Sequence, residues 1–242
     1  MISVSDWARS WARGEGVKPE SAVYLKAVDN WRQAWRPKKV RILLVAESHV
    51  AEQEGDLEVR VKPPRGLRKK LPSQYVRLVY CLGYGEDSLC SQPPKPNPGT
   101  RQFWNIFGAI AAGRISNKQP RLDNSRLEER ISWKLNVLRT LQSRDIWLVD
   151  ASVAGLYSTD KGRLYRNPTC RKMIRESYER YVWPMVRKDL PDQVWVIGRG
   201  VGHALQGRPE ITHRSIISQP QDRTPGRFQR DLARLVAETR TC

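Results

Sequence analysis

Three side chains with catalytic potential follow an apolar run near the start of the chain. Residues 40–46 form the run, and Glu47, Ser48 and His49 come directly after it with a carboxylate, a hydroxyl and an imidazole. A carboxylate stabilises positive charge that develops in a reaction, and an imidazole exchanges protons near neutral pH. The triplet is therefore a candidate catalytic set. Two simpler explanations stay open: an ion pair between Glu47 and an arginine, and an ordinary loop histidine.

Three later apolar runs end in polar or glycine-rich residues in the same way. They cover residues 145–152, 193–200 and 214–220. Unbroken apolar runs are typical of strands that are buried on both faces of a parallel sheet. Ligands bind beyond the carboxyl ends of such strands, so the four strand ends are the places to look for a site. Asp150 supplies a second carboxylate there, although it could equally cap the next segment.

Helical patterns lie between or after these runs and complete the expected fold. Residues 5–35 are expected to be helical, with Pro19 in the first turn of a second helix and a buried aromatic stripe. Strands that alternate with helices predict a doubly wound α/β sandwich. The clearest later helical patterns are at residues 126–142, 170–190 and 226–239.

Two irregular stretches interrupt this alternation. Residues 60–70 are basic, and four prolines stand in residues 92–99. Long loops inside a compact domain are usually functional or disordered, and a loop that is basic and then rigid favours function. We expect one domain over residues 1–242, with N-terminal helices in 1–37 and a basic, Pro-rich insertion in 55–100.

The charge and composition narrow the choice of partners. The chain has 43 lysines and arginines against 25 acidic residues, a formal charge of +18. This excess predicts attraction to a polyanion, usually nucleic acid, although a generally basic surface gives the same count. No C-x-x-C pair and only three histidines are present, so we expect no metal site. No apolar run reaches about 18 residues, so we expect no membrane contact and a cytoplasmic, nucleoid-associated protein.

The order of the strand-end motifs resembles that of the uracil-DNA glycosylase superfamily. The family ends its first strand with a Gly-Glu-Ala-Pro-Gly or Gly-Gln-Asp-Pro type of turn, and AESHV at residues 46–50 stands in that place. The similarity runs from about residue 40 to the C-terminus. Five further segments also resemble the family's motifs. They are the prolines of 93–99, PGTRQFW at 98–104, NIF at 105–107, LVD at 148–150, and ISQP at 217–220 with QDR after it.

The resemblance implies a fold, an activity and a mode of binding. The fold is a three-layer α/β/α sandwich with a four-stranded parallel central sheet. The activity is the excision of a base that is flipped out of DNA, by hydrolysis of its N-glycosidic bond in a monomer without metal or cofactor. The Pro-rich loop would press the phosphate backbone, and the last loop would insert beside the vacated stack. The expected DNA contacts are Arg65, Arg68, Lys69, Lys70, Lys95, Arg101, Gln219, Gln221 and Arg223.

Departures from the family pattern reassign the catalytic roles. Ser48 stands where several branches carry a catalytic Asp or Asn, so the adjacent Glu47 inherits that role, with Glu52 as a second candidate. His49 replaces a proline and would orient water or hold a phosphate. The histidine of the closing motif falls at Ile217, so leaving-group stabilisation must come from elsewhere.

Asp150 stands where the family has an asparagine that faces a uracil edge. A carboxylate only accepts hydrogen bonds, which suits the exocyclic amine of a cytosine-type base. Excision of plain cytosine would ruin the host genome. We therefore expect a modified cytosine, such as one in viral DNA, and a role in antiviral defence. Phe103, Trp104 and Asn105 would complete the base pocket.

Two other functions stay open. The missing motif aspartate and histidine also fit a glycosylase-like module that grips nucleic acid without cutting it. An unrelated α/β nucleotide-binding enzyme could use the glycines of residues 198–202 to cradle phosphate, although tight packing between strand and helix is the simpler explanation of those glycines.

Overall fold

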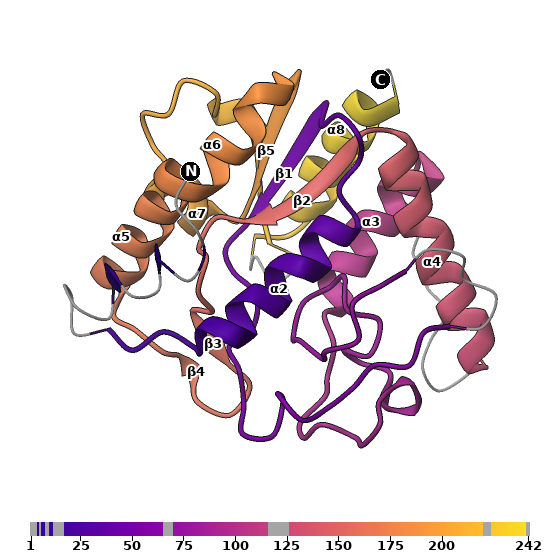
Figure 1. The fold of residues 1–242 in the computed structure, drawn as a ribbon. Coiled ribbons are helices and arrows are strands. Elements are labelled where there is room, and N and C mark those ends of the chain that lie inside the picture. Colours follow the sequence, from indigo (N-terminus) through magenta and orange to yellow (C-terminus); the bar gives the residue numbers. More distant parts are fainter. Residues whose placement is uncertain are drawn as a thin grey trace. The chain divides into compact units, whose positions relative to one another are not determined.

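The computed structural model groups the chain into two compact units whose segments alternate along the sequence (Figure 1). The first unit comprises Met1–Ala34, Glu47–Thr100 and Asp150–Lys188, and the remaining segments form the second unit. The single domain expected from the sequence stays a prediction. The structure describes residues 4, 6–7, 10–11, 17–64, 70–115, 126–219 and 224–240.

A four-stranded sheet organises the second unit, in the strand order β2-β1-β5-β6. Strands β2, β1 and β5 are labelled in Figure 1. The central pair is β1, Ile42–Ala46, and β5, Gln193–Ile197, which run parallel with Ile42 opposite Gln193. The outer strands are β2, Ile146–Asp150, and β6, Ile216–Ile217. Every residue of β1 and β2 is buried, as the unbroken apolar runs indicated.

Four helices accompany this sheet among the described residues of the second unit. They are α3, Arg101–Ala112, α4, Leu127–Ser143, α7, Arg199–Ala204, and α8, Arg227–Arg240. Helix α3 packs against α4 and α8, while α7 and α8 pack against β6. The predicted helices at 126–142 and 226–239 are confirmed as α4 and α8. The fold is therefore α/β with an all-parallel central sheet, as predicted, and is consistent with the three-layer α/β/α sandwich.

The last predicted strand is much shorter than its apolar run. Strand β6 covers two residues and follows a 3₁₀ turn at His213–Ser215. Directly after it, the backbone N–H and the hydroxyl of Ser218 both donate to Asp231 Oδ2 on α8, at 2.9 and 2.8 Å. The backbone N–H that follows the strand therefore bonds to a helix side chain instead of extending the ladder.

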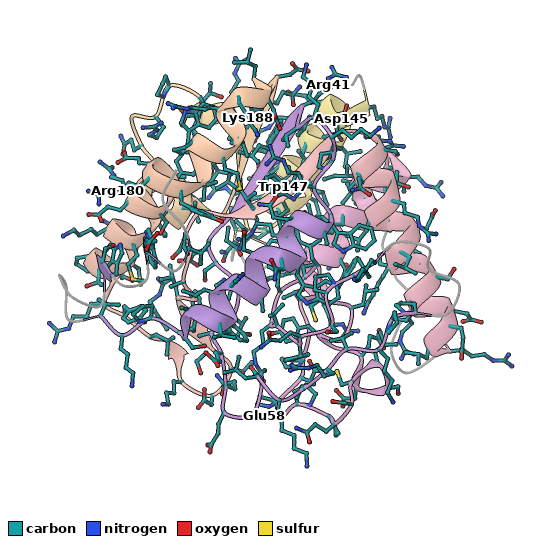
Figure 2. The ribbon with its side chains drawn as sticks, viewed as in Figure 1. Arg41, Glu58, Asp145, Trp147, Arg180 and Lys188 are labelled. Atoms are coloured by element: carbon teal, nitrogen blue, oxygen red, sulfur yellow. The ribbon has the colours of Figure 1, made fainter. Side chains whose placement is uncertain are left out.

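Trp147 illustrates how the core of the second unit is closed. It lies on β2, where it is labelled in Figure 2, and its side chain is fully buried. The guanidinium of Arg36 lies over its ring, 5.0 Å from the centroid, and Arg36 is also paired to Asp189 at 2.8 Å. The arginine covers the ring while it keeps its own charge compensated.

Helix α2 opens the first unit and spans Ala22–Ala34. It begins three residues after Pro19, not at it, because Ser21 provides the cap: its hydroxyl accepts the N–H of Tyr24 at 3.2 Å. Tyr24 and Trp31 are buried, as expected of the aromatic stripe. Trp31 Nε1 also donates to the carbonyl of Gln74 at 2.7 Å, which ties α2 to the chain beyond the basic stretch.

The helical pattern at 170–190 is broken into pieces. Helix α5, Asn167–Ser177, passes into a π-helical turn at Tyr178–Val182, then α6, Trp183–Val186, and a 3₁₀ turn at Arg187–Asp189. Pro184 explains the break. A proline has no N–H to donate and its ring crowds the carbonyl four residues earlier, which a π-helical turn relieves.

The Pro-rich stretch is locked by the side chain of Asn97. Its oxygen accepts from the Tyr75 hydroxyl at 2.9 Å and the Gly85 N–H at 2.8 Å. Its amide nitrogen donates to the carbonyl of Gly83 at 2.9 Å and to Asp87 at 2.6 Å. All four hydrogen-bonding positions of the amide are therefore used within this segment.

Candidate functional site

The candidate site lies in the first unit, where the chain continues from β1 and β2. Glu47, Ser48 and His49 follow β1, and Asp150 ends β2. The N–H of Ser152 donates to the carbonyl of Glu47 at 2.9 Å, so the two segments stay hydrogen-bonded beyond the strands. The predicted meeting of these residues is therefore present in the described structure. Their side chains, however, enter three different environments.

His49 belongs to a buried chain of alternating charges. Its side chain has no exposed surface, and Nε2 lies 2.8 Å from Glu20 Oε1. Nδ1 lies 3.7 Å from Asp150 Oδ2, which is too far for a hydrogen bond but within ion-pair distance. Asp150 in turn accepts from Arg32 Nη2 at 2.7 Å. We call Glu20, His49, Asp150 and Arg32 the buried charge chain.

Neighbouring charges decide the protonation of this chain. Burial alone would lower the pKa of His49, but Glu20 and Asp150 outweigh it and raise that pKa to about 9. Burial would raise the pKa of both Glu20 and Asp150, but His49 and Arg32 hold these pKa values below their usual range. At neutral pH the two anions of this chain therefore face its two cations, and Asp29 adds a part-exposed carboxylate 3.3 Å from Arg32.

This arrangement argues against the roles predicted for His49 and Asp150, which stay untested. His49 is enclosed, and the Asp150 side chain is only 3% exposed and bound to Arg32. A base that took over Asp150 would take the closer of two carboxylates from a buried guanidinium, whose other partner is Asp29 at 3.3 Å. Breaking a buried ion pair typically costs about 3–5 kcal/mol. The structure therefore gives these two residues a structural role. Arg32 is 118 residues away from Asp150 in sequence, so no local sequence pattern could predict that the two residues pair.

Ser48 holds the loop that follows β2. Its hydroxyl accepts the N–H of Leu156 at 3.0 Å. The same loop approaches so closely that a Cβ on Gly155 would lie 2.7 Å from the backbone of Ala51, and the Gly155 N–H donates to Glu20 at 2.9 Å. Ser48 is therefore a positioning residue in this structure.

Glu47 lies in a more open environment than its two neighbours. Its side chain is 14% exposed, and Oε1 lies 3.2 Å from Nη2 of Arg163, whose side chain is 34% exposed. The guanidinium stacks over the Tyr157 ring, 4.7 Å from its centroid, and also contacts the Tyr157 hydroxyl. We call Glu47, Tyr157 and Arg163 the open cluster.

The electrostatics of the open cluster favour proton or charge chemistry at Glu47. Burial raises the pKa of Glu47 above its usual value, and the attraction of Arg163 offsets only part of that rise. Burial, with help from Glu47, also raises the pKa of Tyr157, so its hydroxyl stays protonated. The cluster thus presents a carboxylate of raised pKa beside a cation and a phenol.

A short hairpin that the sequence patterns did not reveal positions the open cluster. Strands β3, Tyr157–Ser158, and β4, Gly162–Arg163, pair antiparallel with Tyr157 opposite Arg163. Gly162 closes the turn with a φ of 70°, a conformation that favours glycine. The Asp-Lys-Gly sequence before Arg163 was the available turn signal.

Glu52, the second catalytic candidate, lies elsewhere in the first unit. It accepts hydrogen bonds from the N–H and the hydroxyl of Ser21, at 3.2 and 3.0 Å, and so supports the cap of α2. It borders a pocket of about 530 Å³ that Glu20 and Lys161 also line. Glu47 does not line this pocket, so the structure does not bring the two candidates together.

The predicted base-binding aromatic residues lie on α3 in the second unit. Trp104 is buried and packs on Phe107 and Trp133, with both ring centroids 6.0 Å away. It is therefore a core residue. Phe103 is partly exposed and Asn105 is exposed, and their contact with a base stays a prediction.

The predicted DNA contacts are only partly described. Arg65, Arg68, Lys69, Gln221 and Arg223 lie outside the described residues. The remaining four predicted contacts are exposed, as contact with DNA requires. They are Lys70, Lys95, Arg101 and Gln219. Their contact with DNA stays a prediction.

Of the glycines in residues 198–202, Gly202 has a packing explanation, whereas a Cβ on Gly200 would meet nothing within 4 Å. A Cβ on Gly202 would lie 2.7 Å from the Ile216 side chain, so only glycine lets α7 approach β6 this closely. The helix that they open has six residues. Nothing in this geometry favours a nucleotide site there.

Within the described parts of the chain, no group of His, Cys, Asp and Glu is arranged to hold a metal ion. In the same parts, no helix combines the length and the apolarity that crossing a membrane requires. No known protein family, curated protein or solved structure matches the chain. We therefore infer its function from the two groups of side chains described above.

Proposed function

We propose that the protein is a DNA glycosylase that excises a non-canonical base and uses Glu47 as its catalytic carboxylate. The observation that carries the proposal is the environment of Glu47, which follows a central strand, is part-exposed and has a pKa raised by burial. Positive charge builds on the sugar as the glycosidic bond stretches. A carboxylate in a poorly solvated place stabilises that charge far better than water does.

The charge of the chain supports a nucleic-acid substrate. A formal charge of +18 draws a polyanion to the surface, and the phosphate backbone would supply most of the affinity. The parallel sheet, with its polar residues just beyond the strand ends, is the arrangement that α/β enzymes commonly use for ligand binding. Neither feature alone selects DNA cleavage over DNA binding.

The choice of base needs an experiment, because Asp150 no longer explains it. Its carboxylate is paired to Arg32 and so does not select the amine of a cytosine. A modified cytosine, and with it a role in antiviral defence, stays part of the proposal as one member of a test panel. The panel consists of duplexes that differ only at one position, which carries uracil, a modified cytosine or an unmodified base.

The test combines this panel with matched variants. Wild-type protein should leave alkali-sensitive breaks at one or more non-canonical bases and none at the unmodified base. Glu47→Gln should lose about 10²–10³ of the rate, the usual cost of one preorganised group. Glu128→Gln, an exposed carboxylate on α4, is the control and should cut normally. An uncut panel, or equal rates in Glu47→Gln and wild type, would contradict the proposal.

A non-catalytic nucleic-acid-binding module is the second candidate, and the buried charge chain favours it. Two of the ionisable side chains at the ends of β1 and β2 are held in buried ion pairs, His49 with Glu20 and Asp150 with Arg32. A module of this kind would bind the panel with steep salt dependence and leave every duplex intact, with or without Glu47.

A further inference from the structure

The backbone around Arg163 is fixed while its side chain reaches the surface. The residue lies on β4, opposite Tyr157 on β3. Strand β3 is held to the segment after β1, because the N–H of Ala51 donates to the Tyr157 carbonyl at 2.7 Å. A third of the Arg163 side chain is exposed, at 34%. The guanidinium thus has a defined origin and room to move.

The Arg163 pair is looser than the other pair between an arginine and a carboxylate near the strand ends. Its N–O distance is 3.2 Å, against 2.7 Å between Arg32 and Asp150. Charge-assisted hydrogen bonds usually measure 2.7–2.9 Å. The hydrogen bonds of Arg163 to Glu47 and to the Tyr157 hydroxyl are both made by Nη2, and the Cys170 side chain is a further polar neighbour of the guanidinium. A guanidinium carries five donors in a planar fork that matches a phosphate, so this pair is open to competition.

We propose that Arg163 binds a backbone phosphate of the substrate and releases Glu47 when it does so. The proposal rests on the proposed function in that the incoming anion is DNA. The Tyr157 ring supports the guanidinium while it exchanges a carboxylate for a phosphate. The exchange also places the phosphate, and the sugar attached to it, next to the carboxylate.

The exchange changes what Glu47 can do. In the free protein the guanidinium offsets part of the effect of burial on Glu47. Once Arg163 turns to the phosphate, Glu47 faces the sugar without its ion-pair partner, and its pKa rises because the attraction that lowered it is lost. Arg163 is therefore a substrate-binding residue whose exchange also releases the carboxylate of Glu47.

The test is a double-mutant cycle on DNA affinity with Glu47→Gln, Arg163→Gln and the double variant, each checked for its melting temperature. The ligand is one short unmodified duplex, measured at several salt concentrations. Glu47→Gln should bind the duplex about two- to five-fold tighter, because binding no longer has to break the part-exposed ion pair between Glu47 and Arg163. Arg163→Gln should bind more weakly, with a salt slope reduced by about 0.9. In the Arg163→Gln background, removal of Glu47 should no longer tighten binding.

Two further variants separate this exchange from simpler effects. Arg180→Gln removes another exposed arginine of the first unit, labelled in Figure 2, and should leave the gain from Glu47→Gln intact. Arg163→Lys keeps the charge without the fork and should restore the salt slope but only part of the affinity. It also serves as the folded substitute if Arg163→Gln melts early.

The outcomes distinguish this proposal from the proposed function. Additive effects of Glu47→Gln and Arg163→Gln would overturn the exchange, and the excision assay would still decide the activity. Non-additive binding without any excision would support the exchange and overturn the glycosylase. A wild-type protein that does not bind the duplex would overturn both.

Discussion

The buried charge chain and the open cluster both start from one short segment, yet they hold carboxylates in opposite ways. His49 and Glu47 are two residues apart. The side chains of the buried charge chain are at most 7% exposed, with 2.7 Å between Arg32 and Asp150 and 2.8 Å between His49 and Glu20. In the open cluster the side chains of Glu47 and Arg163 are 14% and 34% exposed, and their ion pair measures 3.2 Å. The same residue types therefore serve structure where they are sealed and remain exchangeable where solvent reaches them.

Energetics explain why the difference matters. A buried ion pair is costly to break because each partner is left without solvent, whereas a part-exposed pair contributes little and is readily replaced. We infer that the buried charge chain ties α2 to the segments that begin at Glu47 and Asp150 within the first unit, so that the open cluster is presented in one geometry. The predictions below test this division of roles.

Removal of the Asp150 carboxylate is expected to have the largest effect on stability. In Asp150→Ala, Arg32 and His49 face one carboxylate fewer in a buried site, which typically costs about 3–5 kcal/mol of unfolding free energy. Glu47→Ala is the matched change in the open cluster and should cost below about 1 kcal/mol. Urea unfolding measures both values, and equal losses would refute the comparison.

The second largest effect is expected in the pH dependence of stability, to which the buried imidazolium of His49 contributes. Its folded pKa of about 9 lies above the ordinary value of 6.5, so its contribution is complete below pH 6.5 and disappears as pH rises to about 9. That shift corresponds to about 3 kcal/mol. Unfolding measured from pH 6 to pH 9.5 should show the decline, which His49→Gln should lack and the exposed control His203→Gln should keep. A flat wild-type profile would rule out a buried imidazolium.

Ser48→Ala should give the smallest loss. The variant removes the acceptor of the Leu156 N–H, and one such hydrogen bond contributes about 1 kcal/mol. Thermal unfolding measures the change. A loss as large as that of Asp150→Ala would show that Ser48 supports more of the site than this one bond.

The sequence predicted the strands better than the surroundings of the site. Four apolar runs located every strand of the parallel sheet, because burial on both faces leaves a continuous pattern. The triplet after β1 was also found at its predicted place. Local patterns could not tell which of its side chains would be sealed, since that depends on partners far along the chain. Arg32 is 118 residues from Asp150, and Arg163 is 116 residues from Glu47.

The shorter strands were missed or given wrong bounds for a related reason. The β3–β4 hairpin has two residues in each strand, too few for an alternating pattern to stand out. Strand β6 was overestimated, because only Ile216 and Ile217 are apolar in the stretch at 214–220 and the next residue, Ser218, bonds to Asp231. In both cases the hydrophobic pattern is too short to set the boundary.

The most direct test of the central claim compares Glu47→Gln with Asp150→Asn in single-turnover excision. We expect Glu47→Gln to keep its fold and lose about 10²–10³ of the rate. Asp150→Asn should lower stability, while its folded fraction excises at a near-normal rate with unchanged base preference. Folded Asp150→Asn protein that changes its preferred base, together with Glu47→Gln that cuts as fast as wild type, would contradict the account and return Asp150 to the reaction.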